Sequence, residues 1–341
     1  MSKLISGQPN MAAGAAAAND RQPAHHISVS PHIRSAMTTR KMMLLVILAL
    51  LPTTVYGILH FGIMALIHVL VTVLTCVTAE YLYQKLMKQP FNFTDGSAAL
   101  TGLLLALNLP VRAPWWMGIP GGLFAILIVK QLFGGLGQNI MNPALAARAF
   151  LLISFTGQMT DFGMVGAVDA VSAPTALATL KSTGQTLPLL DLLFGRQSGT
   201  IGEVCALAII IGGLFLIVMG IIDYLIPLSY LGSFTLSLML LAPGGFNPAF
   251  IAEHLLGGGL LLGAFFMATD YVTAPIMKPA KLAYGVILGV LTCLFRLFGG
   301  SAEGVSYAII FTNLLVPLLE KVFRPRAFGK QKQRRNGGAT A

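Results

Sequence analysis

The chain has 341 residues, of which 55% are hydrophobic and only 10% charged, and its mean hydropathy is +0.78. About a quarter of the residues of a soluble protein are charged, so this composition excludes an ordinary soluble protein and indicates a membrane protein. Unbroken apolar runs such as 42–51 and 201–222 favour an all-α polytopic fold in the lipid bilayer over a barrel of alternating strands.

The net charge of +10 is concentrated in two tails. Residues 1–41 contribute +4 and residues 321–341 contribute +7, which leaves −1 for the chain between them. Basic flanks of membrane spans usually lie in the cytoplasm. We therefore expect a disordered cytoplasmic leader at 1–41, a cytoplasmic tail at 321–341 and no nucleic-acid partner.

About 20 apolar residues cross a bilayer, and on this basis the sequence predicts about ten transmembrane helices. Ten is an even number, so both basic tails fall on one side of the membrane. Lys85, Lys88, Lys278 and Lys281 fall on that same side, as the excess of lysine and arginine in cytoplasmic loops requires. The predicted spans are 42–59, 63–83, 97–110, 115–133, 143–157, 202–222, 226–242, 250–268, 282–298 and 304–320.

Two short motifs recur at the same offset of 165 residues. PVRAP at 110–114 matches PIMKP at 275–279, and LFGG at 132–135 matches LFGG at 297–300. Because each half of the membrane region holds five spans, an odd number, equivalent segments point in opposite directions. The sequence therefore predicts two inverted five-span repeats, at 42–157 and 201–320, as in proteins that alternate or gate at the membrane midplane.

Polar residues at span ends leave several alternatives open. Asp95, Ser97 and Thr101 either cap the third span or line a polar path, and Asn142 is expected to cap a helix that starts at Pro143. The amides of 137–143 also suit an uncharged heterocycle or an ion.

Charged residues near the span ends also leave alternatives. Carboxylates in such places are usually solvated or paired, but they can also be part of an ion pathway, and arginines there either extend to the interface or bind specific partners. The carboxylates are Glu80, Asp95, Asp223 and Asp270, and the arginines are Arg112 and Arg296.

Residues 158–200 form the one long loop, on the predicted outer side. Loops of this length are usually functional or disordered. The sequence contains no phosphate-binding loop, HExxH motif or GxSxG motif, and the three cysteines lack the spacing of a metal site. We therefore expect no catalytic residue and no metal. By composition alone, the stretch DAVSAPTAL at 169–177 predicts only a turn of small residues.

Several strings, in the same order along 28–328, resemble the family that includes the D-type subunit of the bacterial Rnf electron-transport complex and the B-type subunit of the Nqr complex. They are SPH at 30–32, DGSA at 95–98, LTGLL at 100–104, PWW at 114–116, KQLFGGLGQN at 130–139, NPA at 142–144, LGAFF at 262–266, TD at 269–270 and RLFGG at 296–300.

The resemblance implies a covalent FMN. In that family, a Thr hydroxyl in a motif similar to D-x-x-S/T-G/A-A-T carries FMN through its phosphate. The matching residue here is Thr175, and Asp169 and Ser172 match the other fixed positions. Pro174 replaces the usual Ala, and Ala176 replaces a frequent Pro. A separate flavin transferase makes this bond, and a second, noncovalent flavin such as riboflavin is also implied.

Two functions from different classes follow. The resemblance implies a flavin-carrying subunit, not catalytic alone, in a complex of the ferredoxin/NAD type that couples electron transfer to Na⁺ or H⁺ movement. Its partners would be Rnf subunits of the A, B, C, E and G types in the bacterial inner membrane, with both termini cytoplasmic and Thr175 outside. The alternative is a solute channel or transporter without a redox cofactor, which inverted repeats suit equally well.

Overall fold

The computed structural model describes residues 37–88, 93–162, 175–184, 186–195, 197–242, 247–299 and 304–324. Almost all of the predicted leader and tail lies outside these residues. The chain divides into two units, Met1–Thr38 and Thr39–Ala341, and the helices described below all belong to the second. The described residues contain no strand, and an isolated antiparallel bridge joins Pro110 to Thr200. The fold is therefore all-α, as the composition predicted.

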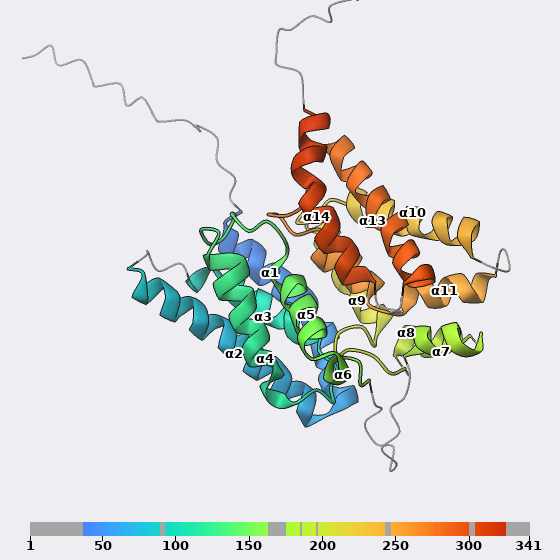
Figure 1. The fold of residues 1–341 in the computed structure, drawn as a ribbon, viewed down its shortest axis with the longest axis horizontal. Coiled ribbons are helices and arrows are strands. Elements are labelled where there is room, and N and C mark those ends of the chain that lie inside the picture. Colours follow the sequence, from blue (N-terminus) through green and yellow to red (C-terminus); the bar gives the residue numbers. More distant parts are fainter. Residues whose placement is uncertain are drawn as a thin grey trace, which may run out of the picture. The chain divides into compact units, whose positions relative to one another are not determined.

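Helical structure occupies each of the ten predicted spans (Figure 1). In chain order the helices are α1 (Thr39–Phe61), α2 (Ile63–Leu86), α3 (Ser97–Leu107), α4 (Gly118–Leu123) with the π-helix η3 (Phe124–Gln131), α5 (Pro143–Ser154), α9 (Ala206–Val218), α10 (Leu225–Leu241), α11 (Pro248–Leu256), α12 (Leu260–Leu262) with the π-helix η4 (Gly263–Met267), α13 (Lys278–Phe298) and α14 (Val305–Val322).

Among the described residues, four of these helices are long and apolar enough to cross a membrane: α1, α2, α13 and α14. A fifth candidate is the pair formed by α11 and the α12–η4 segment, which is bent by 58°. The helices α3, α5, α9 and α10 are apolar but shorter. The chain is thus a multi-pass helical membrane protein, while ten crossings and the inverted repeat stay predictions.

The predicted span at 250–268 is divided into two helical segments. The helix α11 ends at Leu256, and α12 begins at Leu260. Three consecutive glycines, Gly257–Gly259, separate them, and Gly258 and Gly259 have φ angles of +67° and +69°. Because L side chains rarely adopt this left-handed conformation, the glycines permit a sharp turn that a continuous helix would not make. We call Gly257–Gly259 the helix break.

Short helices connect the spans. They are η1 (Phe93–Asp95), η2 (Trp115–Met117), α6 (Thr156–Met159), α7 (Ala176–Thr183) and α8 (Leu189–Phe194). The last two belong to the predicted outer loop, and both contact α11. The far end of that loop is tied to the bundle, because the Ile201 N–H donates to Leu109 O at 3.2 Å and the Gly202 N–H donates to Leu107 O at 2.8 Å.

Small residues bring helices together closely. A Cβ added at Gly289 of α13 would lie 2.5 Å from the backbone N of Phe234 in α10, so only glycine allows this approach. In the same interface, the hydroxyls of Tyr230 and Thr292 are 2.7 Å apart. Close backbone contact and hydrogen bonds across helices are the usual means of association in lipid, where burial of apolar surface supplies little drive.

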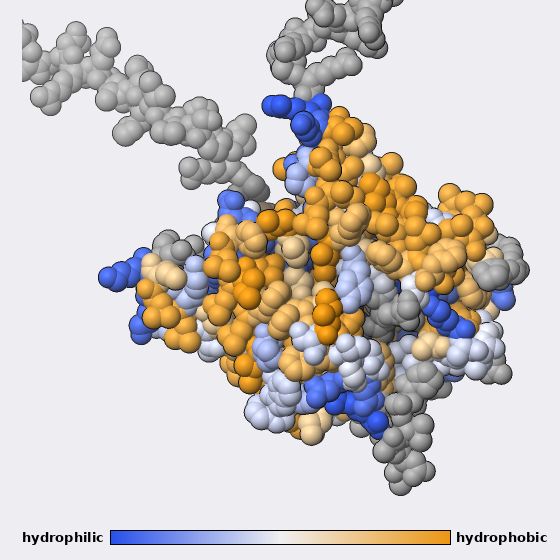
Figure 2. All heavy atoms as spheres, in the orientation of Figure 1, coloured by the Kyte–Doolittle hydropathy of each residue, from blue (hydrophilic) through white to orange (hydrophobic). Residues whose placement is uncertain are grey.

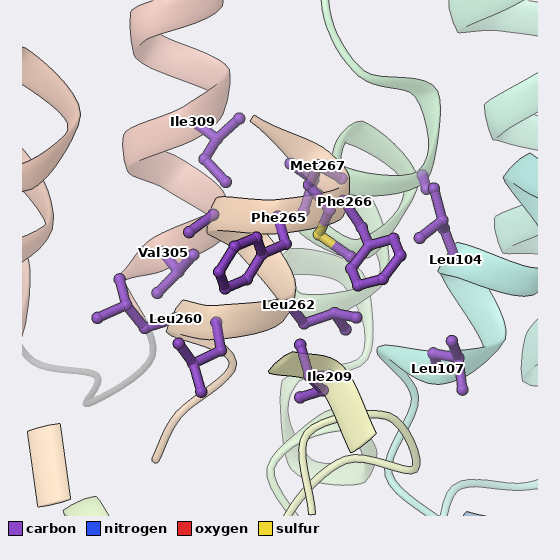
Figure 3. Close-up of a cluster of buried hydrophobic side chains, with 14 of the residues drawn as sticks. Leu104, Leu107, Ile209, Leu260, Leu262, Phe265, Phe266, Met267, Val305 and Ile309 are labelled. Atoms are coloured by element: carbon purple, nitrogen blue, oxygen red, sulfur yellow. The ribbon is translucent and has the colours of Figure 1, made fainter. Parts of the chain in front are cut away.

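The centre of the core lies around η4. Figure 3 shows Phe265 and Phe266 of η4 among apolar side chains from α3, α9, α12 and α14. Leu107 and Ile209, which are shown there, are at most 1% exposed. On the face drawn in Figure 2, apolar residues cover α13 and α14, and hydrophilic residues gather near α6. An apolar exterior of this kind suits contact with lipid or with other membrane subunits.

Candidate functional site

Thr175, the predicted attachment residue, lies at the N-cap of α7. Its backbone is extended (φ −62°, ψ 158°), and its Oγ1 accepts a hydrogen bond from the Ala178 N–H at 3.3 Å. This is the usual capping arrangement, in which a hydroxyl satisfies one of the free N–H groups of the first turn. The residue is buried, with 6% exposed. Asp169 and Ser172, the other two predicted site residues, lie outside the described residues.

The helix that follows Thr175 is anchored at both ends and along one face. Leu177 and Leu180 are buried, and α7 packs against α11 (Figure 1). Near its C-terminus, Lys181 Nζ donates to Gly299 O at 2.6 Å, beyond the end of α13. The helix ends at Gly184, whose φ of +69° is typical of a glycine C-cap. These contacts fix Thr175 relative to α11 and α13.

Arg296 of α13 fixes the helix break. Its Nη2 donates to Gly257 O at 3.0 Å and to Gly258 O at 2.9 Å, and its Nη1 donates to His254 O. These carbonyls are among those that the end of α11 leaves without helical partners. The guanidinium also lies 5.3 Å from the ring centre of Phe234, within the range of a cation–π contact. Arg296 is only 3% exposed. It therefore binds specific partners, and the alternative, that its side chain extends to the membrane interface, is wrong.

A pocket of about 480 Å³ lies between α7, α11 and the end of α13. This volume is within the range of about 300–1,000 Å³ that is common for small-molecule sites. The described residues that line the pocket include two basic side chains and no acidic one. They are Leu177, Leu180, Lys181, Gly184, Leu241, Asn247, Phe250, His254, Arg296, Leu297 and Phe298.

The residues present fit an FMN on Thr175. The hydroxyl lies at the N-terminus of an eight-residue helix, where free N–H groups and the helix dipole favour a phosphate. The pocket that α7 lines contributes Phe250 and Phe298, whose aromatic rings suit a planar ring system. When bound, FMN would supply electron transfer, and the protein would supply position and electrostatics.

A second polar cluster is buried between α2, α3 and η3. Lys130 Nζ lies 2.7 Å from Glu80 Oε1, and both side chains are at most 3% exposed. Lys130 also donates to Ser97 Oγ at 2.6 Å, and Gln131 Nε2 donates to Glu80 Oε1 at 2.9 Å. Ser97 in turn donates through both its N–H and its hydroxyl to Asp95 Oδ1. Asp95 thus caps α3, and Glu80 is paired, as expected of carboxylates at span ends.

Two further ion pairs involve charged residues near span ends. Lys281 Nζ lies 2.9 Å from Asp223 Oδ2, and Arg112 lies 3.7 Å from Asp161. Asp223 lies in the turn between α9 and α10. Burial acts to raise the pKa of Asp223, but the hydrogen bonds from Lys281 and the Leu225 N–H, together with the positive charges of Lys281 and Lys278, lower it overall.

Asn142 caps α5 as predicted, since its Oδ1 accepts from the N–H groups of Ala144 at 3.0 Å and Leu145 at 3.4 Å. Two small cavities of about 50 Å³ each adjoin it, and Asn142 and Asp270 line both. These cavities are smaller than a typical small-molecule site. An ion or heterocycle at this place stays a prediction.

Sequence reasoning did not find the pocket, because its walls come from 177–184, 241–254 and 296–298, which are far apart in the chain. The sequence does contain one signal of the local structure, because the three consecutive glycines at 257–259 indicate a break in a helix. The structure thereby defines the class of protein: a polytopic helical membrane protein with a basic, aromatic pocket lined by a short loop helix that a threonine caps.

Comparisons with known proteins are consistent with this class. The family model described as the NQR2, RnfD, RnfE family matches residues 26–329. Among similar curated proteins, the D-type subunit of the Na⁺-translocating ferredoxin:NAD⁺ oxidoreductase complex of Acetobacterium woodii is 45% identical over 92% of this chain and 98% of its own. The D-type subunit of the proton-translocating complex of Clostridium ljungdahlii is 39% identical over 90% and 96%. The D-type subunit of the ion-translocating oxidoreductase complex of Escherichia fergusonii is 36% identical over 90% and 99%.

The chain belongs to the NQR2, RnfD, RnfE family. The match covers the whole of the predicted range of 28–328, which confirms the resemblance inferred from the short strings.

Proposed function

We propose that this chain is the D-type subunit of an ion-translocating ferredoxin:NAD⁺ oxidoreductase complex and carries FMN on Thr175. Its partners are then the other subunits of that complex and the flavin transferase that loads it. Support comes from the names of relatives that align over nearly their whole length. The similar relatives are named for different ions, Na⁺ and H⁺, so the proposal specifies a monovalent cation.

The position of Thr175 is the observation that carries the cofactor part of the proposal. A hydroxyl at the positive end of α7 favours a phosphate ester, and later residues of the same helix line a pocket with two basic side chains. Covalent attachment prevents a flavin at an aqueous surface from diffusing away. The ring stays free to exchange electrons, and the cofactor performs the redox chemistry.

The flavin test uses the complete complex. The wild-type subunit should give a fluorescent band after denaturing electrophoresis, and the peptide around Thr175 should carry the mass of FMN. Thr175→Ala should lose both signals, whereas Thr183→Ala, in an exposed position of the same helix, should keep them. An active assembly whose Thr175 peptide is unmodified would contradict the cofactor assignment, and a colourless protein with an unmodified Thr175 peptide would favour the channel interpretation.

The topology forms a second part of the proposal. We place the protein in the bacterial inner membrane with ten spans in two inverted repeats, both termini in the cytoplasm and Thr175 outside. Its three native cysteines are buried and unpaired, so single cysteines introduced at exposed sites can be labelled selectively. An impermeant maleimide should label Thr183→Cys from the periplasm and Lys88→Cys only after lysis. The opposite pattern would overturn the orientation.

A further inference from the structure

The pocket of about 480 Å³ lies where two apolar helices end. Leu241 is the last residue of α10 and Phe298 is the last residue of α13, and both line the pocket. The helix α13 is long and apolar enough to cross a membrane, and α10 is a shorter apolar helix. Since a span ends where the hydrocarbon of the bilayer meets the lipid headgroups, the pocket lies at the level of the headgroups.

The rim of the pocket is apolar and exposed. Phe298 is 71% exposed and Leu241 is 43% exposed. Large apolar side chains that are exposed at the end of a membrane helix suit contact with acyl chains. A molecule dissolved in the bilayer can therefore reach the pocket without passing through water.

The described lining of the pocket carries positive charge. Lys181 and Arg296 line it, and no carboxylate is among the described lining residues. Lys181 Nζ donates to Gly299 O at 2.6 Å, and Arg296 Nη2 donates to Gly257 O at 3.0 Å. A carbonyl oxygen satisfies a donor but leaves its positive charge in place. Basic pockets between membrane helices are typical binding sites for the anionic headgroups of lipids.

Lys181 is the cation that a headgroup can reach. Its side chain is exposed on α7, whereas Arg296 is 3% exposed and holds the helix break. A lysine ammonium has three N–H donors, of which Gly299 O takes one. Lys181 can therefore bind a phosphate oxygen without losing its contact to the end of α13.

The exposed face of α10 offers a surface for an acyl chain. Leu228, Leu236 and Leu240 are 67%, 59% and 76% exposed, and the exposed Gly232 continues their spacing of four residues, so the four residues share one face. No neighbouring atom lies within 4 Å of the Cβ position of Gly232, so no described segment covers this part of the helix. The stripe is about 18 Å long, slightly more than the roughly 15 Å of half a hydrocarbon core, and it ends beside Leu241.

The pocket is separate from the attachment residue of the proposed flavin. Thr175 is not among the described lining residues, and Lys181 follows it by six residues, or about 9 Å along the helix axis. A phosphate bound by Lys181 is therefore a different group from a phosphate esterified to Thr175.

We propose that this pocket binds the headgroup of an anionic phospholipid, with Lys181 holding the phosphate and an acyl chain lying on the exposed face of α10. The bound lipid then fixes α7 against the ends of α10 and α13. This inference goes beyond the proposed function and requires no flavin at Thr175.

The test uses the complete complex in vesicles of dioleoyl phosphatidylcholine. Leu241→Trp places an indole at the rim of the pocket as a local reporter. Brominated phosphatidylglycerol or brominated phosphatidylcholine then replaces part of the host lipid, because bromine quenches tryptophan fluorescence on contact. The signal of the complex without the new tryptophan is subtracted. Comparison of the two quenching curves gives the relative binding constant of the anionic lipid. Phe298→Trp is the second reporter if Leu241→Trp fails to assemble.

We expect phosphatidylglycerol to bind at the reporter about fivefold or more tightly than phosphatidylcholine, since one basic side chain near an anionic lipid has about this effect. Lys181→Gln should lower the relative binding constant about fivefold, and Lys181→Arg should keep most of it. Lys88→Gln, which removes an exposed lysine after α2, is the matched control and should leave it unchanged. Inorganic phosphate, which has the charge without acyl chains, should not displace the brominated lipid.

Four results would overturn this proposal. The first is a lack of quenching, or equal quenching by the two brominated lipids. The second is a Lys181→Gln variant with the relative binding constant of the wild type. The third is displacement by inorganic phosphate, which would assign the pocket to a free anion. The fourth is quenching that appears only in Thr175→Ala, because the flavin ring would then occupy the pocket in the wild type. None of the first three affects the proposed function.

Discussion

The buried ion pair between Glu80 and Lys130 gives the strongest stability prediction. At a separation of 2.7 Å and an effective dielectric constant of about 20, the Coulombic attraction is about 6 kcal/mol. Desolvation of the two groups offsets much of this value, so the pair as a whole adds little net stability. Removing one partner is different, because it leaves the other charge buried. We therefore expect Lys130→Met to destabilise the protein by about 3–5 kcal/mol.

The double variant Glu80→Gln/Lys130→Met separates the pair from the packing. It removes both charges, while Gln131, which donates to Glu80 at 2.9 Å, keeps an acceptor. The double variant should therefore be more stable than Lys130→Met alone. Ser97 loses its Lys130 contact in both variants, so that loss cancels in the comparison.

The assay is equilibrium unfolding of the purified chain in mixed dodecyl maltoside and SDS micelles, followed by circular dichroism. The free energy of unfolding is measured for wild type, Glu80→Gln, Lys130→Met and the double variant. The four values form a double-mutant cycle that isolates the coupling between the two side chains. Two results would refute the reasoning. One is a free energy of unfolding of Lys130→Met within about 1 kcal/mol of wild type, well below the cost of a lone buried charge. The other is a double variant that is less stable than Lys130→Met.

Three further predictions concern other sites. Gly258→Ala should destabilise the protein by more than about 1 kcal/mol, because its Cβ would lie 2.2 Å from Leu177 Cδ1; a Tm in detergent equal to that of wild type would contradict this. Asn142→Ala should cost about 0.5–2 kcal/mol through loss of the α5 cap, and Asn142→Ser should restore most of it in the same melt. Because Asp223 has a lowered pKa in the folded protein, its contribution to stability should be present above about pH 4, near the pKa of an unfolded aspartate, and lost as the pH falls through the lower folded pKa. Asp223→Asn should remove this part of the acid dependence, and an unchanged pH profile of the Tm would count against the ion pair.

Local patterns in the sequence predict the helices well. Apolar runs and the residues that bound them place helical structure in all ten expected segments, and the Asn-Pro pair at 142–143 predicts the cap that α5 has. These features depend on neighbouring residues alone. Thr175, by contrast, was found through resemblance, since its own surroundings in the sequence are those of an ordinary turn.

The pocket beside Thr175 could not be predicted, because it depends on contacts between distant segments. Arg296 meets the carbonyls of 254–258 about 40 positions earlier, and no local pattern specifies that pairing. The break inside the predicted span at 250–268 could not be located for a related reason. Hydropathy does not distinguish a straight apolar helix from one divided at Gly257–Gly259, whereas backbone conformation does.

The helix α13 holds polar contacts at both ends. Lys281 near its start binds Asp223, and Arg296 near its end binds the helix break. Fifteen residues separate the two side chains, or about 22 Å of continuous helix. Because a helix of this kind is stiff, a tilt imposed at the Asp223 end displaces the Arg296 end as well. The two ends of α13, one of which borders the pocket, are therefore mechanically coupled.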